Sequence, residues 1–136
     1  MVKDDCIFCK LANGIIPTNT IYEDENFRVF LDASPATKGH CLIVPKEHFA
    51  DLSELDEEIG AKLMPLAKKL MGSLKEKLNC DGLNLVQNNG EAAGQTVFHF
   101  HLHVIPRYKN DGQDINWKPT SPSPEELAAL AEKLEL

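Results

Sequence analysis

The sequence predicts an α+β fold: an antiparallel sheet of about five strands with one principal helix and a short C-terminal helix. Three short strands with tight connections in the first third favour antiparallel pairing. A long amphipathic stretch follows them, and its apolar stripe suits a helix that covers the sheet. The chain of 136 residues has the size of one domain and can bury roughly two thirds of its unfolded surface.

Five segments have the residue types of short strands and are bounded by turn residues. The polar turn Asp24-Glu25-Asn26 joins the first two, while Gly39 and Pro45 bound the third. A helical turn over residues 6–12 precedes them, and a loop rich in Asn, Gly and Ala over 88–94 precedes the last. The predicted strands are residues 20–23, 27–31, 40–44, 83–87 and 97–106.

Leu52 to Asn79 is predicted to be the principal helix, because leucine and isoleucine recur there at three- and four-residue spacing. Pro65 lies inside this stretch, and we expect a kink or a break there, since proline has no N–H to donate. Near the end of the chain, residues 124–136 suit a short helix with Ser123 as its N-cap and Pro124 at its first position.

The net charge and the distribution of basic residues indicate which kinds of partner the chain suits. The net charge is −7 and Lys and Arg do not cluster, whereas nucleic-acid binding leaves a basic footprint, so we expect no nucleic-acid partner. A single nucleotide stays compatible with the negative net charge of the protein, because a few local hydrogen-bond donors are enough for the charges of its phosphates. The charged residues 1–5 are followed by no long apolar run, so we expect no secretion signal, no membrane contact and a cytoplasmic location.

Three histidines alternate with apolar residues in the segment His99-Phe100-His101-Leu102-His103-Val104. Successive side chains of a strand point to opposite faces, so the imidazoles share one face and the apolar side chains anchor the other. On a strand the first and third histidine would lie roughly 13 Å apart. Zn–N bonds are only about 2.0–2.1 Å long, so a single metal does not suit all three. The row instead suits a substrate with several oxyanions in line, such as a phosphate chain.

His101 is the candidate nucleophile, because an imidazole flanks it on each side. It must be neutral for attack, and its other ring nitrogen must be held by an acceptor. Its neighbours would donate hydrogen bonds to the oxygens on which charge accumulates. The alternative is that His101 only bonds a buried backbone group. The preceding Gly94-Gln95-Thr96 offers N–H, amide and hydroxyl donors to an anion, although a plain turn has the same composition.

Cys6 and Cys9 have the spacing of zinc ligands, and a closed tetrahedral site needs two more. The candidates are His48 and His99. A redox disulfide is the competing interpretation, but that motif usually follows a strand, and none is predicted before Cys6. We therefore expect a zinc site that fastens the N-terminal segment to the histidine segment.

His99 to Ile105 matches the histidine-triad (HIT) motif: His, apolar, His, apolar, His, apolar, apolar. Over residues 4–108 the chain resembles this family most closely in its branch of small nucleoside phosphoramidate and dinucleoside polyphosphate hydrolases. The resemblance implies the HIT fold, with residues 1–110 as the HIT domain and 111–136 as a tail of the same domain. The further matching blocks are Cys6-Ile7-Phe8-Cys9-Lys10, Glu23-Asp24, Phe30-Leu31-Asp32, Gly39 to His48, Asn88-Asn89-Gly90 and Gly94-Gln95-Thr96.

The resemblance implies roles for individual residues. His101 would form a covalent nucleotidyl-imidazole that water cleaves, His103 would contact the phosphate and assist the leaving group, and His40 and His99 would complete the catalytic set. Family transferases carry glutamine at the third histidine position, so His103 favours hydrolysis. Asp32 would bind the ribose hydroxyls, although before Ser34-Pro35 it equally suits a turn. The other implied substrate contacts are Ile7, Phe8 and Phe30 for the base, and Asn88, Gly94, Gln95 and Thr96 for the sugar and α-phosphate.

These observations predict a hydrolase that cleaves purine nucleotide conjugates, phosphoramidates or dinucleoside polyphosphates, at the α-phosphate. The family resemblance implies that it is a homodimer whose sheets join across a two-fold axis. It also implies a structural zinc on Cys6, Cys9, His48 and His99, because similar sites occur in relatives and other relatives that lack the cysteines remain active. One alternative is a nucleotide-binding regulatory module with negligible turnover, which would use the same pocket. Another is a metal-dependent oxygenase or hydrolase, which the spacing of the histidine row disfavours.

Overall fold

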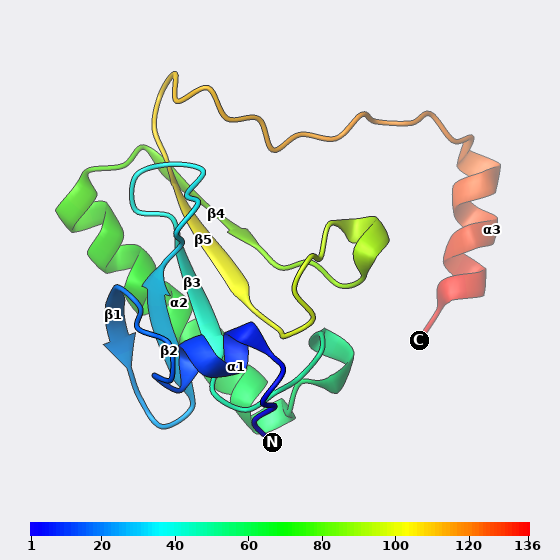
Figure 1. Cartoon of the computed structure of the whole chain (residues 1–136). Coiled ribbons are helices and arrows are strands. Elements are labelled where there is room, and N and C mark those ends of the chain that lie inside the picture. The colour runs from blue at the N-terminus through cyan, green and yellow to red at the C-terminus, as the bar shows by residue number, and fades with distance from the viewer.

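The computed structural model describes residues 1–136 and contains one antiparallel sheet of five strands, as predicted. The order of the strands across the sheet is β1-β2-β3-β5-β4, so β5, which holds the end of the histidine motif, lies between β3 and the edge strand β4 (Figure 1). The strands are β1 (Thr20–Glu23), β2 (Phe27–Leu31), β3 (Cys41–Pro45), β4 (Gly82–Val86) and β5 (Leu102–Arg107).

The histidine strand is shorter than the sequence predicts, because its ladder begins at Leu102 and not at Val97. The register of β3 with β5 would place Phe100 opposite Pro45, which has no N–H to donate. The N–H of Phe100 donates instead to the carbonyl oxygen of Phe49, at 2.6 Å. The predicted alternation of buried and site-facing side chains continues before the ladder begins, since the side chain of Phe100 is buried in the larger core under the principal helix.

The principal helix α2 (Glu57–Leu78) begins later than predicted. Residues 52–54 form a separate 3₁₀ turn, and the carboxylate of Asp56 accepts hydrogen bonds from two N–H groups of the first turn of α2. The helix continues without a break through Pro65. Because proline has no N–H, one backbone hydrogen bond of the helix is missing there. The helix ends at Leu78, and the capping residue Asn79 that follows has a left-handed backbone with φ 53°.

The two faces of the sheet have different covers (Figure 1). Helix α2 packs on one face and buries the larger core; α1 (Ile7–Ala12) packs on the other face against β2 and β3. Leu102 and Val104 belong to the larger core, so His103 between them faces the α1 side. The residues of the larger core are Phe27, Val29, Cys41, Ile43, Phe49, Leu63, Leu66, Ala67, Leu70, Leu74, Phe100, Leu102 and Val104.

Helix α3 (Pro124–Leu134) begins at the predicted N-cap, where Ser123 Oγ accepts from the N–H of Glu126. An extended connection leads to it from the sheet, and in Figure 1 the helix stands apart from the rest of the molecule. None of its residues is buried, and its leucines are exposed. None of the helices combines the length and the apolar character that a membrane span requires.

Candidate functional site

A cavity of about 360 Å³ opens on the α1 side of the sheet, and both His101 and His103 line it. Its wall combines apolar side chains with a carboxylate, hydroxyls and loop backbone, as a ligand with an apolar and a polar part requires. The predicted substrate contacts in the lining are Phe8, Phe30, Asp32, Gly94 and Thr96.

The ring of His101 is held in one tautomer. Its Nδ1 lies 2.6 Å from the carbonyl oxygen of His99, and a carbonyl oxygen can only accept, so Nδ1 carries the proton and Nε2 has a free lone pair. Burial lowers the pKa of His101, so the ring is neutral near pH 7. The ring of Phe8 packs edge-on against it, with 4.8 Å between centroids. A neutral imidazole with an unprotonated Nε2 has the properties of a nucleophile.

A second hydrogen-bond chain sets the tautomers of His40 and His103. The N–H of Ala36 donates to Nδ1 of His40 at 2.9 Å, and since an N–H can only donate, the proton of His40 is on Nε2. That Nε2 lies 2.9 Å from Nδ1 of His103, which therefore accepts, and the proton of His103 is on its own Nε2. Burial lowers the pKa of both rings, that of His103 to about 4, in keeping with neutral imidazoles.

The two oxygens of Asp32 have different surroundings. Oδ1 accepts from the N–H of Ser34 at 2.8 Å, so the carboxylate does stabilise the turn. Oδ2 lies 3.5 Å from Nε2 of His40, and the residue lines the cavity. The turn therefore fixes the carboxylate and leaves one oxygen on the cavity side.

Three predicted substrate contacts do not line the cavity: Ile7, Asn88 and Gln95. The buried amide of Gln95 donates to two backbone carbonyls and accepts from one backbone N–H, so it holds its own loop. Ile7 is 49% exposed and borders a separate hollow beside the cysteines. Asn88 lies beside Gly94, which does line the cavity.

Some lining residues were not predicted as substrate contacts, among them Leu42, although it stands in a matching block, and residues 17–19, which stand in none. The position of Leu42 follows from pairing, since it stands directly opposite His103 across the β3–β5 ladder and shares its face. Residues 17–19 precede β1 and reach the cavity only through the tertiary fold, so no local pattern could have identified them.

The four predicted metal ligands lie together, with ligand atoms of Cys6, Cys9, His48 and His99 within 4.8 Å of one another. Nδ1 of His99 is 3.3 Å from Sγ of Cys6 and 3.4 Å from Sγ of Cys9, and Nδ1 of His48 is 3.4 Å from Sγ of Cys9. Ligand atoms around a tetrahedral zinc, at about 2.0–2.3 Å from the ion, are about 3.3–3.8 Å apart. These three distances therefore fit zinc.

The surroundings of the cluster also suit a cation. Nε2 of His99 donates to the carbonyl oxygen of Pro45 at 2.8 Å, so its Nδ1 presents a lone pair to the two sulfurs. Each sulfur accepts a backbone N–H at 3.3 Å, Cys6 from Cys9 and Cys9 from Lys3. Burial nevertheless raises the pKa of the Cys9 thiol, so its thiolate requires a cation beside it. All five histidines of the chain thus belong to this cluster or to the adjoining cavity site.

The chain is similar to known proteins over most of its length. The family model described as "HIT domain" matches residues 13–110, so it begins after the two cysteines. Adenosine 5'-monophosphoramidase hnt1 of Schizosaccharomyces pombe is 40% identical over 130 residues, which is 95% of each protein. A HIT family protein from Bacillus anthracis has a similar crystal structure, with TM-score 0.88 and 46% identity over 96% of this chain and 95% of that chain. A Zn-bound histidine triad family protein from Mycobacterium smegmatis has TM-score 0.77 and 40% identity over 95% of each chain.

Proposed function

We propose that this chain, which belongs to the HIT domain family, is a nucleotidyl hydrolase that cleaves purine nucleotide conjugates at the α-phosphate. The observation that carries the proposal is the state of His101: it lines the cavity, its Nδ1 proton is engaged by the carbonyl of His99, and its Nε2 is unprotonated. The similarity to a protein named adenosine 5'-monophosphoramidase supports a nucleotide conjugate as the substrate.

The proposed reaction has two displacements at phosphorus. First, the lone pair on Nε2 of His101 bonds to the α-phosphorus, and the leaving group departs with the electron pair of its own bond to phosphorus and takes up a proton from solvent. The Nε2–H of His103 donates to the oxygens on which charge accumulates. Water then bonds to phosphorus and releases a proton, the P–N bond breaks, and Nε2 regains its lone pair. The hydrogen bond from Nδ1 to the carbonyl of His99 stabilises the cationic ring between the two steps.

The cavity wall supports a division of the substrate among the lining residues. Phe8 and Phe30 meet edge to face, with 6.5 Å between centroids, and would flank a purine base. Oδ2 of Asp32 would accept from the ribose hydroxyls. The backbone of Gly94 and the hydroxyl of Thr96 would donate to the phosphate.

Trapping the intermediate tests the proposal. The protein is mixed with an adenosine phosphoramidate, quenched at high pH after milliseconds to seconds, digested and examined by tandem mass spectrometry. We expect a nucleotidyl adduct on His101. Turnover with an adduct on another residue contradicts the mechanism, and tight binding without any turnover supports the regulatory module instead.

We also propose a structural zinc on Cys6, Cys9, His48 and His99, in the site whose spacing fits that ion. Four protein ligands close the coordination sphere, so the ion supplies cohesion and no reactive water. The Zn-bound histidine triad protein from Mycobacterium smegmatis supports this assignment.

We also propose a cytoplasmic location. None of the four cysteines forms a disulfide, and a reducing compartment such as the cytoplasm keeps thiols in this state.

We propose that the protein is a homodimer in which α3 of one copy packs on the other. An isolated helix of this length is marginal in water, yet Leu127, Leu130 and Leu134 form an exposed apolar stripe along α3. The edge strand β4, with Leu85 exposed, is a second surface that a copy of the chain could cover. Asp111 accepts from Arg107 of β5, and Gln113 donates to Ala36 in the β2–β3 loop, which supports placing the segment that begins at residue 111 in the same domain.

The oligomeric state is measured by light scattering coupled to size exclusion. We expect the mass of two 15.1 kDa chains for the wild type. The pair Leu127→Glu and Leu130→Glu should shift the protein to single chains, because each charge would be buried in the interface. Ala129→Glu, on the opposite side of α3, is the matched control and should stay dimeric. A wild type that has the mass of one chain at every concentration contradicts the proposal.

A further inference from the structure

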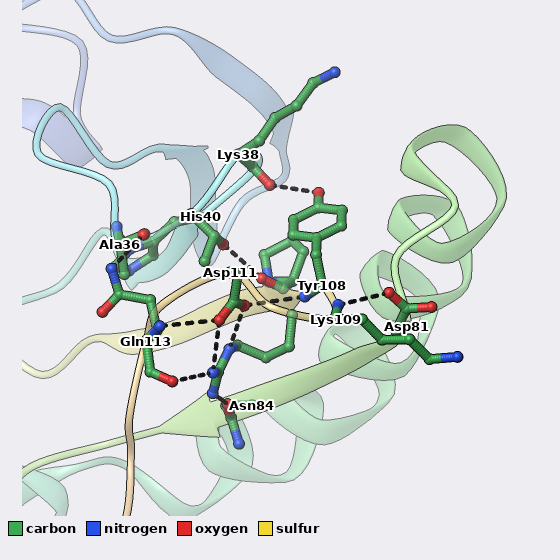
Figure 2. Close-up of polar contacts among 12 residues, drawn as sticks. Ala36, Lys38, His40, Asp81, Asn84, Tyr108, Lys109, Asp111 and Gln113 are labelled. Carbon is green, nitrogen blue, oxygen red and sulfur yellow. Dashed lines mark hydrogen bonds and ion pairs between the residues drawn. The ribbon is translucent and has the colours of Figure 1, made fainter.

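The loop between β2 and β3 is fastened by residues at the end of β5 and beyond it (Figure 2). Nε2 of Gln113 donates to the carbonyl oxygen of Ala36 at 2.9 Å, and the hydroxyl of Tyr108 donates to the carbonyl oxygen of Lys38 at 2.7 Å. The hydroxyl of Thr37 donates to the carbonyl oxygen of Pro106. Three consecutive loop residues are therefore tied to residues 106–113, which are distant in sequence.

Residues 107–113, which hold the loop, are themselves connected by a network of hydrogen bonds around Arg107 and Asp111. Nε and Nη2 of Arg107 donate to the two oxygens of Asp111, at 2.8 and 3.0 Å, and Arg107 lowers the pKa of this carboxyl well below its usual range. Asp111 also accepts from the N–H groups of Tyr108 and Gln113, both at 3.0 Å. The carbonyl of Gln113 accepts from Nη2 of Arg107 at 2.7 Å. In Figure 2 the side chains of Gln113 and Tyr108 point to Ala36 and Lys38 of the loop.

The fastened loop contains the N–H that, together with the Asp32 carboxylate 3.5 Å from Nε2, sets the tautomer of His40. The carbonyl of Ala36 accepts from Gln113, and the N–H of the same residue donates to Nδ1 of His40 at 2.9 Å. A shift of this residue would remove the donor and let His40 take its proton on Nδ1. Nε2 of His40 would then be a bare acceptor, and His103 would have to donate from Nδ1. The Nε2 of His103 would lose its proton and could no longer donate to a phosphate.

We infer that Gln113 and Tyr108 are positioning residues, which act through the loop and His40 to keep the proton of His103 on Nε2. Neither residue lines the cavity, so neither is a contact of the substrate. The consequence for turnover rests on the proposed hydrolase function, whereas the tautomers of His40 and His103 do not.

Imidazole ¹⁵N–¹H correlation spectra of the intact protein test the inference, together with steady-state kinetics on an adenosine phosphoramidate. In the wild type we expect His40 and His103 to be neutral with the proton on Nε2. In the double variant Gln113→Ala with Tyr108→Phe, both rings should become mixtures of tautomers. The kcat should fall about tenfold with little change in KM, because a mispositioned donor acts on the transition state. Asn116→Ala, an exposed tail amide with no side-chain hydrogen bond, should match the wild type in both measurements.

A second pair of variants reports on the loop without touching the tail. Thr37→Val removes the hydroxyl that bonds to Pro106 and should shift the tautomers in the same way, whereas Thr37→Ser keeps the hydroxyl and should restore the wild-type spectrum. Wild-type spectra for His40 and His103 in the double variant overturn the inference, whatever the turnover and whatever the spectrum of Thr37→Val. Shifted tautomers in a protein that has no hydrolase activity in any form uphold the positioning and refute the proposed function instead.

Discussion

His101→Ala is expected to reduce turnover of an adenosine phosphoramidate by about 10⁴-fold or more, because it removes the atom that bonds to phosphorus. Binding of AMP should persist, since the apolar wall, Asp32 and the loop donors remain in place. Rapid-quench turnover assays and calorimetry with AMP, on the same preparation, measure the two effects.

Added imidazole provides the control for this variant. The substitution leaves a space the size of the missing ring, next to the edge-on ring of Phe8 and the carbonyl oxygen of His99. Free imidazole should enter this space and restore part of the turnover of His101→Ala, with no effect on the wild type. Turnover that is unchanged in His101→Ala would exclude this residue as the nucleophile.

Cys9→Ala is expected to lose the bound zinc and to lower the free energy of unfolding by about 4 kcal/mol, because the buried site would lack one ligand and its bound ion. Elemental analysis of protein prepared without chelator gives the zinc content, and thermal or denaturant unfolding gives the stability. Turnover measured well below the melting temperature should persist, since none of the four ligands is the proposed nucleophile.

Cys80→Ala is the matched control for this variant, because Cys80 is a half-buried free thiol outside the cluster. It should keep zinc and stability. Wild-type protein that contains no zinc under these conditions contradicts the metal assignment. Loss of turnover upon zinc removal, at a temperature where the fold persists, would instead support the metal-dependent hydrolase.

Much of the fold could be predicted because its determinants are local. The apolar side chains of Phe100, Leu102 and Val104 alternate in sequence and are buried together in the core. The end of the ladder could not be predicted in this way, because it depends on Pro45 in another strand. The predicted start of α2 is too early, because the leucine pattern begins before the Asp56 cap, in the separate 3₁₀ turn of residues 52–54.

The candidate site was predictable where side chains carry the chemistry and not where the backbone does. The motif histidines and the four candidate metal ligands were predicted from residue type, spacing and the family resemblance. The structure places the four candidate ligands together, and His101 and His103 both line the cavity. The donor that sets the tautomer of His40 is the backbone N–H of Ala36, and any residue except proline provides such a group. The contribution of Gln113 depends likewise on a contact with a residue far away in the sequence.

Residue 99 takes part in two neighbouring sites through different atoms. Its imidazole points to the cysteines, while its peptide oxygen orients the ring of His101. A peptide oxygen is supplied by every amino acid, so the orienting contact depends on the path of the main chain and not on the identity of this side chain. A variant of the chain without thiols could therefore replace the imidazole and still orient the nucleophile, provided that other packing holds the main chain along the same path.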